Sequence, residues 1–570
     1  MDGQENSSTS IEMPSRPWLA QYPEAINWHA TFEARPFQSL LDEALVRYAD
    51  RSCVDFLGHQ MTYADIDRMA ARVARGLQDL GVKKDTKIGL FLPNCPYSVA
   101  CFFGILRAGG TVVNYNPLYV TREIEQQVLD SETEIMITLD LDQLLSKITP
   151  LVGKGPLRAV IVAKLAACLP WPKRILYPLV KRADIAKVPS DPAFVPFDQL
   201  AANDGRFDIV PIEPNEDIAL LQYTGGTTGI PKGAVHSHAS LVINADQLAA
   251  WAPDTELGRE RILGVLPLFH VFAVSVVLSF GIRVGATLTL LPRFDLDQVL
   301  KTIVRKRPTM LPGVPTMYNA ISSHKDIDRA DLTSIKLCLS GGAPLPIEVK
   351  QTFENKAGCT IVEGYGLTEA PVTHCNPFVG LQKQGSFGVP MPGTSIEIVS
   401  IEDGETVLPP GERGEVCLSG PQVMKGYWRR TDETKAALRN GRLHTGDIGY
   451  LDADGYGFIV DRLKDLIICS GFNVYPRVVE EALYEHPEVL EAAVCGIADD
   501  YRGETVKAYV VRKDGAHLDE ATLITFLQER LSPIELPKII DFRDDLPKSA
   551  VGKILKKELR REEMEREKAT

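Results

Sequence analysis

The sequence predicts an α/β protein: a large N-terminal domain of parallel-rich sheets with flanking helices plus a β-rich subdomain, and a small mobile α+β C-terminal domain. The length of 570 residues is too great for one compact core. Short apolar runs alternate with helical stretches across the N-terminal half. From about Gly385 onward, short β-rich stretches with glycine turns replace this alternation, at 414–420 and 455–460.

The alternation begins near Leu80. An apolar run at 87–92, a helical spacing at 98–107 and a second strand at 110–114 follow one another. Further strands continue the series at 135–138, 159–162, 219–222, 287–291 and 335–339. Because strands separated by helices usually pair in parallel, we expect helices on both faces of the sheet.

The C-terminal part is expected to be a separate unit. A charged stretch at 461–465 lies between two apolar strands and suits a hinge. Beyond it, helices are predicted at 478–485 and 518–531, and strands at 492–497 and 506–511. The predicted organisation is a disordered lead-in (1–16), an N-terminal domain (17–460, with the β-rich subdomain at about 385–460), a hinge (461–466) and a C-terminal domain (467–570).

Composition narrows the functional classes. The formal net charge of −13 disfavours nucleic acid as a partner. The ten cysteines include no CxxC pair, and residues 1–16 lack the apolar core of a signal peptide, so reduced thiols and a cytoplasmic location are expected. Residues 263–282 have a membrane-spanning length, but Pro267 interrupts them, which favours a buried core helix.

A loop rich in glycine and threonine follows the predicted strand at 217–223. Glycines allow the backbone N–H groups to surround an anion, hydroxyls donate to phosphate oxygens, and Lys232 adds a positive charge. Pro231 before this lysine and Gly233 after it distinguish the loop from the Walker A pattern; a flexible turn is the alternative. The candidate phosphate-binding residues are Thr224, Gly225, Gly226, Thr227, Thr228, Gly229 and Lys232.

Residues 223–233 resemble the AMP-binding signature of the adenylate-forming superfamily, which includes acyl-CoA synthetases, beetle luciferases and the adenylation domains of nonribosomal peptide synthetases. The resemblance extends from Thr62 to Lys553. It implies an N-terminal AMP-binding domain followed by the C-terminal domain of the same enzymes, with ATP as a substrate.

The stretch 363–369 offers several groups to a nucleotide. Gly366 lets a flat base approach, Tyr365 offers a stacking face, and Glu369 is a hard oxygen ligand suited to Mg²⁺. The resemblance implies that Thr368 contacts the α-phosphate and that Glu369 and Thr224 hold magnesium. A glycine-rich turn with a capping glutamate is the alternative. The candidate ATP-binding residues here are Gly364, Tyr365, Gly366 and Thr368.

Two more stretches follow predicted strands or apolar runs. Residues 339–344 lie at the carboxyl edge of the inferred sheet, where open α/β sheets bind ligands. The resemblance implies that Gly341, Gly342 and Ala343 border the adenine and the acyl pocket. His270 lies in an apolar stretch and could be an ordinary core histidine. The resemblance implies instead that it lies at the mouth of the acyl site and helps to position the carboxylate.

The last candidates lie near the predicted hinge and beyond it. A carboxylate such as Asp447 can accept hydrogen bonds from both hydroxyls of a ribose. Arg462, Lys464 and Lys553 are further candidates for ATP binding. The resemblance assigns the ribose-binding role to Asp447, assigns Lys464 to the pivot and implies that Arg462 reaches the nucleotide. It assigns Ser470, Gly471 and Phe472 to the loop that lines the path of the coenzyme A (CoA) thiol. Lys553 matches the lysine that promotes adenylation, while a solvated turn is the ordinary interpretation of a charged residue in such positions.

The resemblance therefore implies an AMP-forming acid–thiol ligase with Mg²⁺ as cofactor and ATP and CoA as co-substrates. The carboxylate attacks the α-phosphorus of ATP, and the thiol of CoA then attacks the acyl-adenylate. Chemistry of this kind depends on positioning and charge neutralisation rather than on a side-chain nucleophile. The predicted catalytic residues are Lys553, His270, Thr368 and Glu369.

The stretches 18–24, 103–109, 114–119 and 172–177 resemble those of bacterial long-chain fatty-acid–CoA ligases. Medium-chain, branched, dicarboxylic and aryl acids remain alternatives. Peptide-synthetase adenylation predicts a following carrier domain, luciferase-like oxidation lacks positive support, and a non-catalytic nucleotide-binding protein predicts loss of Lys553 or Glu369, both of which are present.

Residues 159–188 combine basic and apolar side chains. The bases are Lys164, Lys173, Arg174, Lys181, Arg182 and Lys187, against one acid, Asp184. One interpretation is a surface loop and helix with solvated lysines. The other is a patch that contacts an anionic membrane, which would make the protein peripheral at the inner face of the membrane. A homodimer is a further hypothesis about partners.

Overall fold

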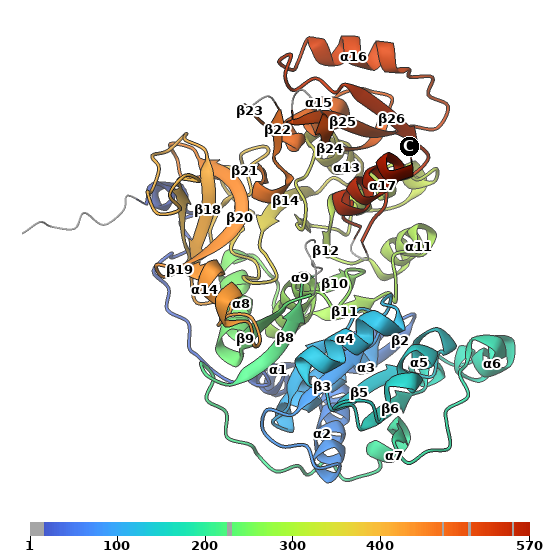
Figure 1. The fold of residues 1–570 in the computed structure, drawn as a ribbon. Coiled ribbons are helices and arrows are strands. Elements are labelled where there is room, and N and C mark those ends of the chain that lie inside the picture. The colour runs from blue at the N-terminus through green and yellow to red at the C-terminus, as the bar shows by residue number, and fades with distance from the viewer. Residues whose placement is uncertain (1–15, 225–230, 470–471, 500–502, 550–551, 570) are drawn as a thin grey trace, which may run out of the picture.

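The computed structural model describes residues 16–224, 231–469, 472–499, 503–549 and 552–569. The protein has a mixed α/β architecture with two large parallel-rich sheets, a β-rich sheet and a small C-terminal α/β unit, which lies at the top in Figure 1. One apolar core runs through the first three sheets, from Trp18 to Tyr456. Two separate clusters begin at Ile467 and Ala493. The predicted hinge at 461–466 falls between these cores.

The first large sheet has seven strands, and all neighbours pair in parallel except the last pair, β8 and β9. Its order is β7 (Phe194–Pro196), β6 (Ala159–Ala163), β5 (Ile135–Leu139), β3 (Lys87–Phe91), β4 (Thr111–Asn114), β8 (Ile218–Tyr223) and β9 (Gly233–Ser237). Its central strands are buried on both faces, which explains their continuous apolar runs.

The second large sheet has nine strands, with a parallel centre and antiparallel pairs at both ends. Its order is β16 (Val389–Pro390), β15 (His374–Cys375), β14 (Thr360–Tyr365), β13 (Leu337–Ser340), β12 (Met310–Gly313), β10 (Arg261–Gly264), β11 (Thr287–Leu290), β1 (Ser52–Phe56) and β2 (His59–Thr62). The carboxyl ends of its parallel strands lead into the loops that carry several predicted site residues.

The two smaller sheets are mostly antiparallel. The β-rich sheet contains β17 (Ser395–Val399), β18 (Gly414–Ser419), β20 (Arg442–Leu451), β19 (Leu438–Arg439) and β21 (Gly457–Arg462). The C-terminal sheet contains β23 (Phe472–Val474), β22 (Ile467–Cys469), β25 (Gly503–Arg512), β24 (Val489–Asp499) and β26 (Ile539–Arg543), of which β26 pairs with β25 in parallel.

Helices cover the large sheets and the C-terminal sheet (Figure 1). Local sequence explains several of their starts: Thr62 and Asp65 form a reciprocal capping box at the start of α2, which satisfies N–H groups that the first turn leaves unpaired. The helices are α1 (Ser39–Tyr48), α2 (Tyr63–Asp79), α3 (Pro96–Arg107), α4 (Thr121–Ser131), α5 (Asp142–Ile148), α6 (Lys173–Val180), α7 (Phe197–Leu200), α8 (His238–Trp251), α11 (Leu296–Lys306), α12 (Pro315–Ser322), α13 (Ile347–Ala357), α14 (Thr431–Ala437), α15 (Pro476–Tyr484), α16 (Glu520–Gln528) and α17 (Lys556–Ala569).

The apolar segment 263–282 is buried in the core, as predicted, but it is not one helix. Its first residues complete β10 and form a loop, and the helical part consists of α9 (Val271–Ala273), one π-helical stretch (Val274–Ser279) and α10 (Phe280–Arg283). Pro267 lies in the loop, where the missing N–H costs nothing. In the described part of the chain, no helix combines the length and the apolar character that crossing a membrane requires.

Candidate active site

The predicted phosphate loop connects β8 to β9 at the carboxyl end of β8. The two strands form an antiparallel hairpin, and the N–H of Thr224 donates to the carbonyl oxygen of Lys232 over 2.9 Å. This bond fixes the two ends of the loop side by side. Five of its predicted phosphate-binding residues, Gly225, Gly226, Thr227, Thr228 and Gly229, lie outside the described residues.

A tyrosine connects this hairpin to the predicted metal ligand. Tyr427 lies beside β9, where it forms a bridge with Ala234. Its hydroxyl donates to Oε1 of Glu369 over 2.6 Å, and Nζ of Lys232 lies 5.2 Å from the centre of its ring. Burial and the neighbouring carboxylate raise the pKa of Tyr427, so the hydroxyl stays protonated and keeps donating. We did not predict Tyr427 from the sequence, because an aromatic residue after a glycine is equally typical of a core position.

A histidine ties the same hairpin to Thr368. Nε2 of His236 on β9 donates to the carbonyl oxygen of Thr368 over 2.8 Å. Burial lowers the pKa of His236 to about 4, so the imidazole is neutral at physiological pH. The loop after β14 is tight: a Cβ added at Gly366 would lie 2.8 Å from the backbone nitrogen of Val372. The turn itself therefore requires glycine at this position.

Asp447 is a buried carboxylate, 2% exposed, with a partner for each oxygen. The hydroxyl of Tyr365, at the end of β14, donates to Oδ2 over 2.5 Å. Nε of Arg462, at the end of β21, lies 2.8 Å from Oδ1. The carboxylate raises the pKa of Arg462 and, together with burial, that of Tyr365. These contacts bring together three residues that the sequence predicts to bind the nucleotide.

Lys553 lies close to this group and to His270. Burial of the amine, with the positive charges of Arg462 and Lys464, lowers the pKa of Lys553 to about 8, although Asp447 opposes that effect. Burial and the charge of Lys553 lower the pKa of His270 to about 4. The residue as a whole nevertheless keeps exposed surface.

The Lys553 loop is also attached to the N-terminal body. The hydroxyl of Thr316 at the start of α12 donates to the carbonyl oxygen of Gly552 over 3.0 Å. Nδ1 of His270 is buried and has no hydrogen-bond partner among the described residues, so this polar atom is available to a ligand.

The glycines after β13 and on β14 line the same edge of the nine-stranded sheet. A Cβ at Gly341 would lie 2.9 Å from the ring of Phe272, and Gly342 has a φ of +79°, so the loop that ends at Ala343 favours glycines. Gly364 lies on β14, beside β15. Lys464 lies in a short 3₁₀ turn between β21 and β22, and burial lowers its pKa. Ser470 and Gly471 lie outside the described residues, and Phe472 begins β23.

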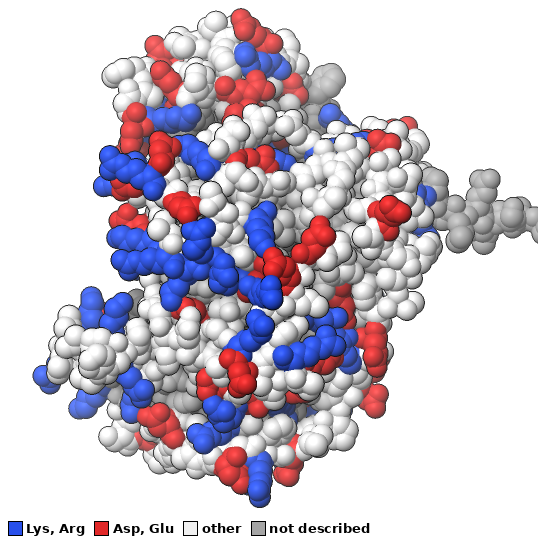
Figure 2. All heavy atoms as spheres, turned by 180° about the vertical axis from the view of Figure 1, so that it is seen from behind, with Lys and Arg blue, Asp and Glu red and all other residues white. Residues whose placement is uncertain are grey.

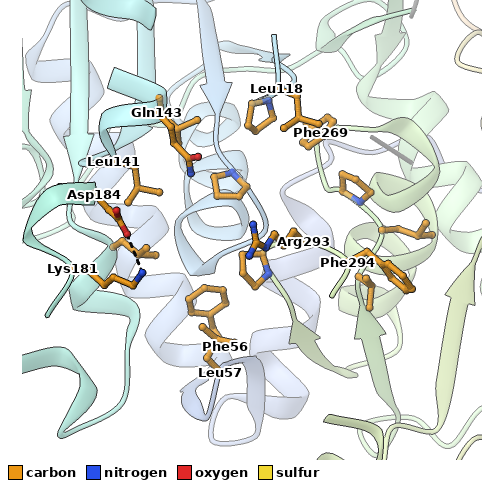
Figure 3. Close-up of a pocket in the computed structure, with 18 of the residues that line it drawn as sticks. Phe56, Leu57, Leu118, Leu141, Gln143, Lys181, Asp184, Phe269, Arg293 and Phe294 are labelled. Carbon is orange, nitrogen blue, oxygen red and sulfur yellow. Dashed lines mark ion pairs between the residues drawn. The ribbon is translucent and has the colours of Figure 1, made fainter. Parts of the chain in front are cut away.

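A cavity of about 1400 Å³ opens beside this group. Its lining includes Phe269 and Gly552, the neighbours of His270 and Lys553, and α6 residues such as Tyr177. Figure 3 shows it between the two large sheets, with Leu141, Phe56 and Phe294 facing inward, and Lys181 paired with Asp184 at one side. Mostly apolar side chains surround this space, which suits a long apolar molecule.

Comparisons with known proteins show the family to which the chain is related. The AMP-binding enzyme family model matches residues 41–428, and the model of the AMP-binding enzyme C-terminal domain matches 478–553. The chain is 44% identical over 563 residues to a long-chain-fatty-acid–CoA ligase of Bacillus subtilis, covering 96% of this chain and 98% of the relative. It is 37% identical over 507 residues to a feruloyl-CoA synthase of an Amycolatopsis species, covering 88% and 94%.

Solved structures of related enzymes have the same fold. ATP-bound MatB from Rhodopseudomonas palustris superposes with a TM-score of 0.81 at 28% identity, covering 93% of this chain and 99% of that one. The anthranilate CoA ligase in complex with anthranoyl-AMP superposes with a TM-score of 0.83 at 27% identity, covering 94% and 99%.

The charges around Lys553 predict how its pKa responds to substitution. We expect Arg462→Gln to raise the pKa of Lys553, because a repelling charge is lost, and Asp447→Asn to lower it, because an attracting charge is lost. Trace labelling with acetic anhydride between pH 6 and 11, followed by mass spectrometry, measures the midpoint, and the peptide that contains Lys557 is the internal standard. An unchanged midpoint in both folded variants would contradict this account.

Proposed function

The chain belongs to the AMP-binding enzyme family, and on this premise we propose that it is a long-chain-fatty-acid–CoA ligase. It converts a carboxylic acid, ATP and CoA to acyl-CoA, AMP and pyrophosphate through an acyl-adenylate. The observation that carries the proposal is the convergence of Lys553, His270, Arg462 and Asp447 beside a large apolar cavity. Sequence identities of 38% to 44% to several long-chain-fatty-acid–CoA ligases, over 96% of the chain, support the substrate class.

In the first step, a carboxylate oxygen of the acid attacks the α-phosphorus of ATP, and the bond to the bridging oxygen breaks to release pyrophosphate. Negative charge builds up on the phosphate oxygens, so a nearby cation lowers the barrier. Lys553 supplies this cation. A pKa of about 8 leaves most of the amine charged at pH 7, and the charge of ATP would raise that fraction further. Thr368 contacts the α-phosphate, and His270 helps to position the carboxylate.

The residues around the β8–β9 hairpin fit a triphosphate with a magnesium ion. Lys232 and the loop from Thr224 to Gly229 surround the phosphates. Glu369 would hold the ion together with Thr224; Tyr427 donates only to Oε1, so the other oxygen of Glu369 still has lone pairs to offer. When bound, the ion would neutralise charge on the phosphate oxygens.

The nucleoside lies among the groups next to this hairpin. Asp447 accepts hydrogen bonds from the ribose hydroxyls, since a carboxylate has about four acceptor positions and the described residues occupy two of them. Tyr365 stacks on the base, and the glycine loops border the adenine. Those loops contain Gly341, Gly342, Ala343, Gly364 and Gly366.

In the second step, the sulfur of CoA attacks the acyl carbon, the bond between that carbon and the phosphate oxygen breaks, and AMP leaves while the thiol proton passes to solvent. The loop of Ser470, Gly471 and Phe472 lines the path of the thiol. This step requires the C-terminal domain (467–570) to rotate on the N-terminal domain (17–460) about Lys464 in the hinge (461–466). The separate apolar cores of the two parts support such a rotation.

Pyrophosphate release tests the substrate class. We expect the highest kcat/KM for saturated acids of about 12 to 18 carbons, because burying each added methylene contributes roughly 0.8 kcal/mol to binding. We expect pyrophosphate release only when ATP and Mg²⁺ are present. Octanoate, ferulate and malonate serve as the alternative substrates. A preference for ferulate or malonate would contradict the long-chain assignment while leaving the ligase assignment intact.

Lys553→Ala separates the two half-reactions. We expect loss of acyl-adenylate formation by about a thousandfold, the rate equivalent of ~4 kcal/mol for one well-placed cation. Conversion of supplied acyl-adenylate to acyl-CoA should change little, because the domain has rotated Lys553 away. Lys557→Ala, four residues along, is the matched control. Equal loss of both half-reactions in a folded variant would exclude the alternation.

We also propose that α6 and the turn before it contact an anionic membrane. No residue of α6 is buried, and Trp171 and Leu179 are 79% and 72% exposed. Basic residues border these apolar side chains; Figure 2 shows the α6 lobe at lower left as a pale surface edged with blue. Apolar insertion and attraction to anionic headgroups together suit a peripheral contact, which is consistent with a substrate that partitions into membranes.

That the protein forms a homodimer stays a prediction from the sequence.

Vesicle sedimentation tests this contact. We expect Trp171→Ser and Leu179→Ser each to weaken binding to phosphatidylserine-containing vesicles by roughly tenfold, the equivalent of losing one inserted apolar side chain. Binding should also fall with salt and be absent on uncharged phosphatidylcholine vesicles. Ile209→Ser is the control, since Ile209 is 88% exposed but lies elsewhere. Equal effects of all three substitutions would refute the contact.

A further inference from the structure

A bulge in β20 determines where Asp447 points. Glu415 on β18 is opposite Ile448, but Cys417 is opposite His444, so three residues of β20 face the single residue Val416. Within the bulge, Gly446 has a φ of +69°. Such bulges redirect a side chain that regular pairing would send elsewhere. Here the redirected residue is Asp447, which reaches Tyr365 and Arg462.

Glu415 holds this bulge from the neighbouring strand. Its Oε1 accepts the N–H of Gly446 over 3.0 Å, and its Oε2 lies 2.8 Å from Nδ1 of His444. Glu415 and His444 are each only 8% exposed. Thr445 completes the bulge: its hydroxyl donates to the carbonyl oxygen of Val416 over 2.7 Å and accepts the N–H of Asp447 over 3.1 Å. The backbone that leads into Asp447 is therefore fixed by partly buried polar contacts.

The same cluster could be taken for a metal site, because Glu415, Cys417 and His444 offer ligand atoms within 4.8 Å of one another. Two observations disfavour a cation. Burial and Glu415 raise the pKa of the Cys417 thiol to about 12, so it stays protonated. Nη2 of Arg439 lies 2.8 Å from the same Nδ1 of His444 and already places a positive group there. The cluster is an ion-pair network that supports the strand.

We propose that Glu415 is a positioning residue for nucleotide binding, which acts on Asp447 through Gly446 and His444. This inference rests on the proposed role of Asp447 in holding the ribose. Removing the carboxylate leaves the N–H of Gly446 without its partner and removes the contact to Nδ1 of His444, so the bulge relaxes. Displacement of a ligand-binding group by about 1 Å is enough to lower activity by as much as a hundredfold. The loss of nucleotide affinity should depend on the contacts that Asp447 makes with the ribose hydroxyls.

Deoxynucleotides provide the test. In the pyrophosphate-release assay, we expect the wild-type enzyme to prefer ATP to 2′-deoxy-ATP and 3′-deoxy-ATP. Glu415→Ala should raise the KM for ATP by about tenfold, a typical cost of one lost buried hydrogen bond, and should abolish this preference. The KM values for the acid and CoA should not change. Glu415→Gln, which keeps an oxygen for the N–H of Gly446, should restore most of the preference.

Glu397→Ala is the matched control, because Glu397 on β17 makes an ion pair with Arg442 over 2.6 Å in the same sheet but does not contact the bulge. It should keep the preference for ATP. If Glu415→Ala does not fold, His444→Ala is measured in its place and should show a smaller loss of the same preference.

Asp447→Ala separates the failure of this inference from the failure of its premise. If Asp447→Ala loses the preference while Glu415→Ala keeps it, or slows all nucleotides equally, the positioning role is wrong. If Asp447→Ala itself keeps the preference for ATP, the proposed role of Asp447 is wrong, and the inference falls with it.

Discussion

The buried carboxylate of Asp447 is the constraint on which the arrangement of the site depends. A charge in this position is tolerated only if both oxygens have partners, and here one partner comes from the nine-stranded sheet and the other from the neighbouring strand of the β-rich sheet. Tyr365 is the last residue of β14 in the nine-stranded sheet, and Arg462 is the last residue of β21, within the predicted hinge. One carboxylate thereby links the end of β14, the β-rich sheet and the segment that leads to the C-terminal part of the chain.

The charges that surround this carboxylate also control its neighbours. Arg462 is held by Asp447 and at the same time lowers the pKa of Lys553, and Lys553 in turn helps to keep His270 neutral. Arg462 and Lys464 both repel the amine of Lys553, so a bound polyanion such as the proposed nucleotide would relieve this repulsion as well as add contacts. The affinity for a nucleotide and the protonation state of Lys553 would therefore depend on the same charged groups.

The sequence predicted the class of fold and most central strands, because a strand buried on both faces leaves a continuous apolar run. The predicted ends of helices and strands were less accurate. The helix predicted at 518–531 spans only Glu520–Gln528, because helix propensity does not show where tertiary contacts stop. Glycine- and threonine-rich motifs were recognisable because their chemistry is local. Tyr427, His236 and Glu415 were not, because each acts through a partner far away in the sequence.

The apolar clusters of the C-terminal part contain only residues from Ile467 onward, and the large core contains none of them. The described attachments between the two bodies, such as the hydroxyl of Thr316 on the carbonyl of Gly552, are polar and can exchange with water at a net cost of only about 1 kcal/mol each. A reorientation of the C-terminal part would therefore leave each apolar cluster intact. It would need to break contacts such as this one rather than unfold either part, so the binding energy of a ligand could favour one orientation over another.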